Sequence, residues 1–167
     1  MARILVIDNY DSFVYTIVDY LRLLGAETTV VRNDDDVPSP SSFDGVLVSP
    51  GPGTPAAAGC SMDIIGECAG QGVPMLGVCL GHQLASVALG GSVGRNPSGR
   101  TTGVVPVALT DAGASDPLLA GVDGALAVHY NDDVVLEVPT GATVLATLPD
   151  GRPQALRFGP SAWGVQF

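Results

Sequence analysis

Cys79 is the residue whose surroundings most favour chemistry. It lies in Gly77-Val78-Cys79-Leu80-Gly81-His82-Gln83, between an apolar run typical of a buried strand and the start of an amphipathic helix. A sharp turn from strand to helix can hold a nucleophile in a strained, exposed conformation, and a glycine two residues to either side leaves room for that turn. The dipole of the following helix would favour the thiolate form of Cys79. The Leu80 amide could stabilise an oxyanion that forms when Cys79 attacks a carbonyl. We interpret Cys79 as a nucleophile, with a buried structural cysteine as the alternative.

A glycine- and proline-rich segment at residues 49–55 is the second candidate for the site. It reads Ser-Pro-Gly-Pro-Gly-Thr-Pro and directly follows the apolar run 45–48. Alternating glycine and proline form neither a helix nor a strand ladder, so the segment should be an irregular loop that presents backbone amides. Taken alone, it could be only a rigid turn. One strand away from Cys79, at the edge where open parallel sheets bind ligands, it predicts an oxyanion hole built from two loops.

Apolar periodicity predicts the elements that position these loops. Short apolar runs indicate buried strands, and apolar residues at helical spacing indicate helices between them. Ser12 could cap the first helix, and Gly25 could end it. The alternation predicts a parallel sheet with helices on both faces. The expected strands span 4–7, 28–31, 45–48 and 74–78, and the expected helices span 14–24, 62–68 and 80–88.

Beyond Gly91 helical periodicity is hard to find, and the pattern favours strands. Asp150-Gly151 is typical of a hairpin turn. The chain therefore predicts a single α/β domain over 1–167, with an open, mostly parallel sheet and a β-rich C-terminal half. The expected strands in this half span 104–109, 125–130, 143–148, 155–158 and 162–167.

Composition excludes several classes of protein. The 167 residues contain 7 Lys+Arg and 17 Asp+Glu, for a net charge of −10, which argues against nucleic-acid binding. No apolar run is long enough to span a membrane, and no signal peptide is evident. The three cysteines, Cys60, Cys68 and Cys79, form no CxxC pair, so neither a disulfide framework nor a zinc site is indicated. We expect a cytoplasmic protein.

Three motifs together resemble the class I (Cys-His-Glu) glutamine amidotransferase domain, which has a flavodoxin-like fold. They are Pro-Gly-Pro-Gly, Gly-Val-Cys-Leu-Gly-His-Gln and Trp-Gly-Val-Gln-Phe, and the resemblance covers essentially the whole chain. Segments 8–13 and 31–34 are similar to the amidotransferase subunits of anthranilate synthase and aminodeoxychorismate synthase. This resemblance implies a glutaminase that passes ammonia to a chorismate-binding synthase subunit, in tryptophan or folate biosynthesis. It implies no metal or organic cofactor in this chain.

The resemblance also implies roles for individual residues. Cys79 would attack the side-chain amide of L-glutamine and form a glutamyl thioester, while the amides of Gly53 and Leu80 would form the oxyanion hole. His82 belongs to the motif but is expected to be structural. Asp132 and Asp133 stand where a Ser-Leu pair would help to bind glutamine. The expected substrate-binding set is Gly51, Pro52, Gly53, Leu80, Gln83, Asp132 and Asp133.

Two departures from the family pattern leave alternatives open. The family continues after Gly-Val-Gln-Phe with His-Pro-Glu, so at Phe167 we expect the domain to lack this segment and its last helix. The chain could then be a catalytically incomplete subunit that binds and stabilises a synthase. From Gly121 to Ala146 the sequence is closer to free-standing members of the family. A free-standing amidotransferase or amidase that uses His129 as its base is therefore a third hypothesis.

Overall fold

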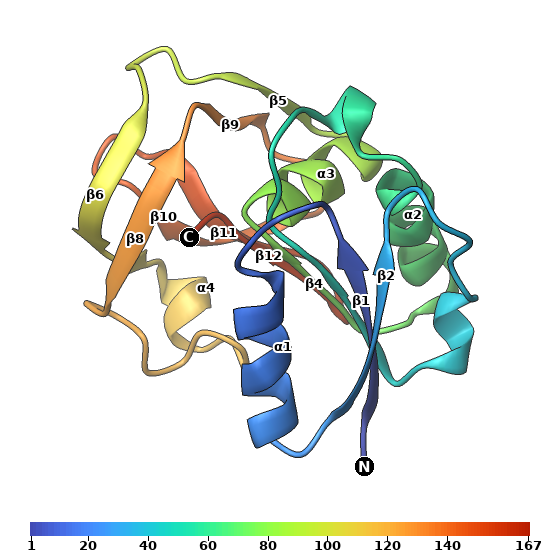
Figure 1. Ribbon diagram of the computed structural model, residues 1–167. Helices are drawn as coiled ribbons and strands as arrows, with labels where there is room; N and C mark the ends of the chain where they lie inside the picture. Colours follow the sequence, from blue (N-terminus) through green and yellow to red (C-terminus); the bar gives the residue numbers. More distant parts are fainter.

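A mixed sheet of eight strands forms the centre of the computed structural model, which describes residues 1–167 (Figure 1). Five neighbouring strands are parallel, and the remaining three continue the sheet in antiparallel pairs. The α/β class and the mostly parallel sheet are therefore confirmed. In spatial order the strands are β2 (Glu27–Arg32), β1 (Arg3–Asp8), β3 (Gly45–Val48), β4 (Met75–Val78), β12 (Ala162–Val165), β11 (Pro153–Gly159), β10 (Thr143–Thr147) and β7 (Ala108–Leu109).

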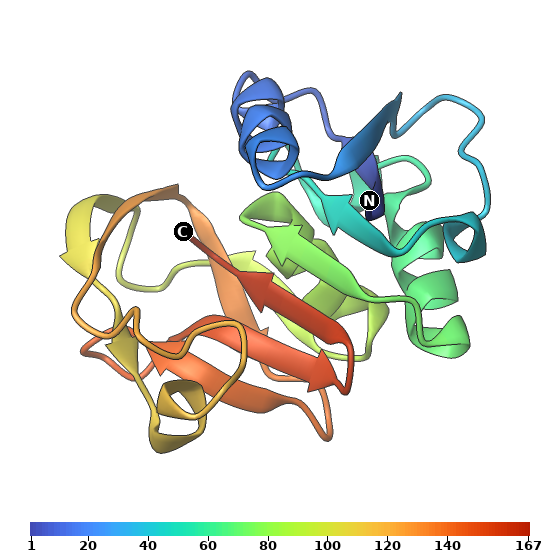
Figure 2. The ribbon, with the colours of Figure 1, turned by 90° about the horizontal axis from the view of Figure 1, so that it is seen from below.

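Helices cover both faces of the parallel half, as expected. Helix α1 (Val14–Leu23) lies on one face, and α2 (Ser61–Gln71) and α3 (Leu80–Ala88) lie on the other (Figure 2). Side chains of a strand alternate between faces, so neighbours in β1 enter different cores. Val6 packs with Val14 and Val18 of α1, whereas Leu5 and Ile7 join the core under α2 and α3. Apolar runs in β1 and β3 are explained by this burial on both faces.

The C-terminal half adds two antiparallel ribbons to the sheet. One pairs β5 (Ser92–Arg95) with β9 (Asp133–Glu137), and the other pairs β6 (Thr101–Pro106) with β8 (Leu126–Asn131). A separate core forms around residues of β10 and β11, and the short helix α4 (Asp111–Ala114) packs on β10 and β7 at its edge. Gly151 has a φ of 86° in the turn between β10 and β11, which confirms the predicted hairpin.

Three sequence predictions in this frame are wrong in detail. Ser12 does not cap α1, because Phe13 is the N-cap residue and the Asp11 carboxylate accepts the Phe13 amide at 2.7 Å. The single strand expected over 104–109 is divided between β6 and β7, which pair with different strands. The last strand ends at Val165 rather than Phe167. The short strands β5 and β9 and two 3₁₀ turns, η1 (Pro40–Ser42) and η2 (Pro55–Ala57), were not expected.

Strand β12 joins the two halves of the sheet. It lies between β4 and β11, pairing in parallel with the first and antiparallel with the second. Val165 stands opposite Val78, and its carbonyl accepts the Cys79 amide at 2.8 Å. The carboxyl end of β12 is thus anchored directly beside the turn that carries Cys79. No helix of the fold combines the length and hydrophobicity of a membrane span.

Candidate active site

Cys79 lies on a strained turn between β4 and α3. Its φ of 53° and ψ of −104° are unusual for a residue with a side chain, and only Tyr10 among the other non-glycine residues has a positive φ. A Cβ at Gly77 would lie 2.4 Å from the Gly81 carbonyl oxygen, and a Cβ at Gly81 would lie 2.2 Å from that of Val48. Both positions therefore require glycine, and the predicted tight turn is confirmed.

The environment of the Cys79 sulfur does not by itself produce a thiolate. Burial raises the pKa of the thiol above its ordinary value, and the carboxylate of Asp11 acts in the same direction. The Leu80 amide and the Gln166 side chain, whose Nε2 lies 3.7 Å from Sγ, lower the pKa in part. The expected contribution of the Leu80 amide is present, but burial outweighs it. Cys79 thus needs a base to become nucleophilic at neutral pH.

The glycine-proline loop is held in place by the buried side chain and backbone of Asn9. A Cβ at Gly51 would lie 2.4 Å from the Asn9 carbonyl oxygen, so the loop and Asn9 are in close contact. The amide of Asn9 donates to Ser49 Oγ and its Nδ2 to the Ser49 carbonyl, both at 2.9 Å. Its Oδ1 accepts from Asn33 Nδ2 at 2.9 Å and from Ser61 Oγ at 2.7 Å. Asn9 therefore ties the loop to three parts of the chain.

This role of Asn9 was not found from the sequence. The signal available was only an Asp8-Asn9 pair at the end of the apolar run 4–7. Four hydrogen bonds that depend on Ser49, Asn33 and Ser61 are long-range and carry no local pattern.

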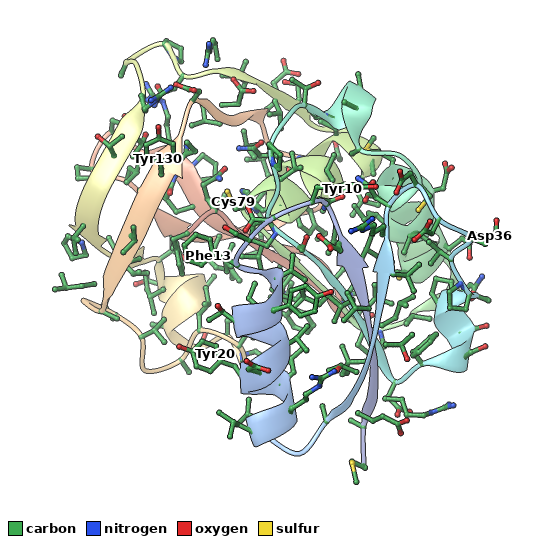
Figure 3. The ribbon with its side chains drawn as sticks, in the orientation of Figure 1. Tyr10, Phe13, Tyr20, Asp36, Cys79 and Tyr130 are labelled. Atoms are coloured by element: carbon green, nitrogen blue, oxygen red, sulfur yellow. The ribbon has the colours of Figure 1, made fainter.

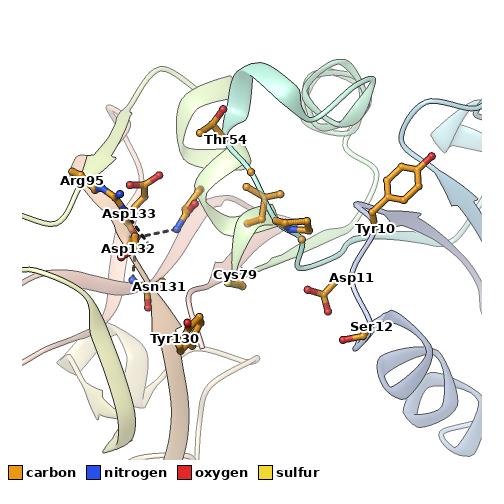
Figure 4. A pocket seen from close by; sticks show the side chains of 15 residues that line it. Tyr10, Asp11, Ser12, Thr54, Cys79, Arg95, Tyr130, Asn131, Asp132 and Asp133 are labelled. Atoms are coloured by element: carbon orange, nitrogen blue, oxygen red, sulfur yellow. Dashed lines mark hydrogen bonds and ion pairs between the residues drawn. The ribbon is translucent and has the colours of Figure 1, made fainter.

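An open cavity of about 870 Å³ lies over Cys79 (Figure 4). Every residue that the sequence nominated for the site lines it, from the glycine-proline loop, the turn, α3 and the segment after β8. The nominated residues are Gly51, Pro52, Gly53, Cys79, Leu80, Gln83, Asp132 and Asp133. The lining also includes seven residues that the sequence did not nominate for catalysis or glutamine binding: Tyr10, Asp11, Ser12, Thr54, Arg95, Tyr130 and Asn131.

Gln83 connects the Cys79 turn to the opposite wall of the cavity, which residues 130–133 form and which we call the far wall. Its Nε2 donates to the Asp133 carbonyl at 3.0 Å and to Gln166 Oε1 at 3.1 Å. Asn131 Nδ2 donates to the same carbonyl at 3.0 Å. The backbone of Asp133 is thus hydrogen-bonded to Gln83 of α3, and this bond fixes the position of the far wall relative to α3.

Asp132 is held by two arginines on the rim of the cavity. Its carboxylate accepts from Nε and Nη2 of Arg100, each at 2.8 Å, and lies 3.1 Å from Nη1 of Arg95. The hydrogen bond with Arg100 is the main cause that lowers the pKa of Asp132. Arg100 also stacks on Tyr130, 5.0 Å from the ring centroid, and donates to its hydroxyl at 3.0 Å. The Asp132 carboxylate, which was expected to help bind glutamine, is therefore already paired with arginine side chains.

Neither histidine lines the cavity. His82 is completely buried against Phe158, its ring nitrogens have no hydrogen-bond partner, and burial lowers its pKa to about 4. This placement agrees with the structural role expected for it. His129 is buried beside Phe167, with a pKa lowered by burial. Its exclusion from the cavity lining argues against the hypothesis that it acts as a base for Cys79.

No group of three or more His, Cys, Asp or Glu side chains is arranged to hold a metal ion. The cavity contains the thiol of Cys79 on its strained turn, the glycine-rich backbone of residues 51–53, and polar side chains opposite them. These groups suit nucleophilic attack on a carbonyl carbon and binding of a small polar substrate.

Comparison with known proteins agrees with this chemistry. The family model described as glutamine amidotransferase class-I matches residues 5–167. Anthranilate synthase component 2 of Mycobacterium tuberculosis is 43% identical over 177 residues, covering 99% of this chain and 73% of that protein. Aminodeoxychorismate synthase of Streptomyces griseus is 39% identical over 171 residues, covering 99% of this chain and 23% of that protein.

The fold is also shared with solved structures. A glutamine amidotransferase from Thermotoga maritima superposes with a TM-score of 0.85 at 20% identity, covering 99% of this chain and 75% of that one. At this identity the likeness concerns the fold, and the sequence matches carry the family relationship.

Proposed function

The chain belongs to the class-I glutamine amidotransferases, and from this premise we propose that it is the glutaminase component of a chorismate-using synthase. Its relatives named anthranilate synthase component 2 and aminodeoxychorismate synthase support this assignment. L-Glutamine is the proposed substrate, and a chorismate-binding synthase subunit is the proposed partner. The free cysteines are consistent with the reducing cytoplasm as its location.

The first half-reaction is attack of the Cys79 thiolate on the side-chain amide carbon of glutamine. A C–S bond forms, and the carbonyl oxygen becomes an oxyanion that the Leu80 and Gly53 amides stabilise. Gly53, at a φ of 104°, can turn its amide in a direction that a residue with a side chain would rarely adopt. Collapse of the tetrahedral intermediate breaks the C–N bond, and the leaving nitrogen takes from the base the proton that the base removed from the Cys79 thiol, so that it departs as ammonia. The product on the protein is a glutamyl thioester.

Hydrolysis of the thioester completes the cycle. Water attacks the thioester carbon, the C–S bond breaks, and glutamate leaves while the thiolate is restored. Gln83 and the backbone around Asp132 and Asp133 would hold the substrate through both steps. The Asp132 carboxylate is paired with Arg100, and the Gln83 Nε2 group already donates to Asp133 and Gln166, so we assign side-chain binding of the substrate on this side of the cavity to Gln83 Oε1.

A base is needed for both steps, since burial raises the pKa of Cys79. We propose that this base is the histidine that the family pattern places directly after Phe167. The observation that supports it is the position of Gln166, whose Nε2 lies 3.7 Å from Cys79 Sγ. A residue that follows Phe167 would thus start close to the thiol.

The observation that carries the proposal is the meeting of strained Cys79, the Gly51–Gly53 loop and Gln83 around one cavity. The test combines the full-length protein with its synthase subunit and measures product formation from chorismate, with glutamine or with ammonium as nitrogen source. Cys79→Ala should lower the glutamine-dependent rate on the order of 10³-fold or more and leave the ammonium-dependent rate unchanged. A wild-type complex that uses ammonium but not glutamine would contradict the proposal.

The same assay separates the alternatives. A subunit that only stabilises its partner would form the complex but show no glutamine hydrolysis with or without Cys79. A free-standing amidase would hydrolyse glutamine without any effect of the synthase subunit, and His129→Gln would abolish that activity.

A further inference from the structure

The loop between β3 and α2, residues 49–60, carries Gly53 but has few anchors along its length. Residues 50–56 form no hydrogen bond with any part of the chain outside this loop. Three of these residues are prolines, at positions 50, 52 and 55, and a proline has no amide hydrogen to donate. The position of the Gly53 amide therefore depends on how the two ends of the loop are held.

One side-chain amide holds both ends. Nδ2 of Asn9 donates to the carbonyl of Ser49, the first residue of the loop, at 2.9 Å. Its Oδ1 accepts from Oγ of Ser61, the first residue of α2, at 2.7 Å. The same Oδ1 accepts from Asn33 Nδ2 at 2.9 Å, and the Asn33 carbonyl accepts the Cys60 amide at 2.8 Å. Asn9 joins the beginning of the loop to its end, which requires a donor and an acceptor on one side chain.

This cluster is closed to water. Asn9, Ser49, Ser61 and Asn33 are all buried. A Cβ at Gly59 would meet the Asn33 carbonyl, so the end of the loop packs directly on the cluster. Solvent cannot replace a hydrogen bond lost here, and the remaining partners would be left unsatisfied. The ends of the loop are thus held more firmly than its middle.

The cluster lies at the same edge of the sheet as Cys79. Ser49 follows β3, which pairs with β4, and Cys79 follows β4. Figure 3 marks this edge by Tyr10, the residue after Asn9, and by Cys79. Strand β12 lies on the other side of β4, so it takes no part in these contacts. Asn9 itself does not line the cavity, and any effect on the reaction must pass through the loop.

We propose that Asn9 is a positioning residue for the oxyanion hole, because its side-chain amide fixes both ends of the β3–α2 loop and thereby the Gly53 amide. This inference rests on the proposed function, in which that amide stabilises the oxyanion formed from glutamine. A donor to the oxyanion acts mainly in the transition state. Displacing it by about 1 Å is expected to slow the reaction on the order of 10²-fold.

The test measures glutamine hydrolysis by the full-length protein in complex with its synthase subunit. Asn9→Ala should lower kcat on the order of 10- to 10²-fold, with KM changed by less than about threefold. Ser61→Ala removes only the contact at the start of α2 and should lower kcat by a smaller factor, roughly three- to tenfold. Thermal unfolding of each variant shows whether it has folded.

Thr110→Val is the matched control. Thr110 Oγ1 donates to the Val144 carbonyl at 2.8 Å and accepts from the Gly113 amide at 3.0 Å, so it is also a long-range polar tether. It does not line the cavity. Its replacement should lower the thermal unfolding temperature while kcat and KM remain those of the wild type.

A second measurement separates the oxyanion hole from the thiol. Iodoacetamide forms a C–S bond with the Cys79 thiolate as the C–I bond breaks and iodide leaves, and no oxyanion develops at its carbonyl. The alkylation rate of the Cys79 peptide, followed by mass spectrometry, should therefore stay within about twofold of wild type in Asn9→Ala and Ser61→Ala. A general loss of structure around the turn would change this rate together with hydrolysis.

The outcomes distinguish this inference from the function on which it rests. If the wild-type complex does not hydrolyse glutamine, the proposed function fails. If the wild type hydrolyses glutamine and the folded variants keep its kcat, Asn9 does not position the oxyanion hole. Equal losses of hydrolysis and alkylation, or a raised KM at unchanged kcat, would also overturn the inference. If Asn9→Ala does not fold, Ser61→Ala decides by the same criteria.

Discussion

Cys79 can adopt its strained conformation because the residues around it have no side chains to obstruct it. The glycines at positions 77 and 81 are each within 2.4 Å of a backbone oxygen when a Cβ is added. The oxygens belong to neighbouring backbone that cannot move without disturbing β3 or α3. The turn is therefore specified by close backbone contacts, while the reactivity of the sulfur depends on what surrounds it.

Alanine at position 81 should destabilise the protein, whereas alanine at another helical glycine should not. In Gly81→Ala the new methyl group would meet the Val48 carbonyl, and the expected loss of unfolding free energy is about 1–3 kcal/mol, with loss of glutaminase activity. Gly66 in α2 is exposed and has no atom near its added Cβ. Gly66→Ala should stabilise by about 0.5–1 kcal/mol. Urea unfolding measures both, and equal effects would contradict the close contact at Gly81.

The alkylation rate of Cys79 should rise with pH throughout the neutral and mildly alkaline range. Only the thiolate reacts, and burial raises the pKa of the Cys79 thiol above its ordinary value, so the thiolate population still increases through the mildly alkaline range. Mass spectrometry of peptides after brief iodoacetamide treatment gives the rate for each cysteine. Cys68, completely buried and with a pKa raised to about 11, serves as the slow internal reference. A plateau in the Cys79 rate near pH 7 would show that the thiol is already ionised.

At the scale of elements, the site depends on the end of β8 being held in place. The bidentate pair between Arg100 and Asp132, and the stacking of Arg100 on Tyr130, fix the segment whose Asp133 carbonyl accepts from Gln83. The pKa of Asp132 is lowered, so the pair remains ionised at neutral pH and is lost only as the pH falls into the acid range. The far wall of the cavity is thus positioned by a loop contact rather than by a helix.

Removal of this contact should affect substrate binding more than turnover. Arg100→Ala should raise the KM for glutamine roughly three- to tenfold, with a smaller change in kcat, because the wall moves while Cys79 and its turn remain. Arg22 is a suitable control, since it is an exposed arginine on α1 that donates to Thr28 Oγ1 at 2.9 Å, away from the cavity. Arg22→Ala should leave both constants unchanged. Steady-state kinetics of the two variants decide the matter, and an effect on kcat alone would contradict it.

The parts of the site that sequence could predict are those encoded locally. Burial on both faces gives β1 and β3 continuous apolar runs, and the glycines around Cys79 mark its turn, so these elements were identified correctly. The pairing of Arg100 with Asp132 joins residues far apart in sequence. The same holds for the contacts of Asn9 with Ser49 and Ser61. Strand β5, with Ser92 and Gly94, has too little apolar character to be distinguished from a loop.

At the scale of the whole molecule, the buried His82 links stability to pH. Its pKa is about 4 in the folded protein and 6.5 when exposed, so the unfolded chain binds an additional proton between these values. Above about pH 6.5 His82 is neutral in both states and does not reduce the free energy of unfolding. As the pH drops toward 4, proton uptake by the unfolded chain lowers that free energy. From the difference in pKa, the loss reaches about 3 kcal/mol.

Urea unfolding at pH 7 and pH 4.5 tests this linkage. His82→Leu should unfold with a smaller difference between the two pH values than the wild type, since the group that takes up the proton is absent. His129, whose pKa is also lowered by burial, continues to contribute in both proteins. An identical pH dependence in wild type and His82→Leu would assign the effect to other groups.

The central position of β12 has a consequence for the order in which the protein can form during synthesis. One edge of β4 stays unpaired until residues 162–165 leave the ribosome, although β1 to β4 and the three helices around them are made much earlier. The hydrogen bond from the Cys79 amide to Val165 is equally late. A nascent chain released or cut before β12 would expose an open edge of hydrophobic sheet, which is prone to aggregation. We expect the turn that carries Cys79 to reach its final geometry only when this strand is inserted.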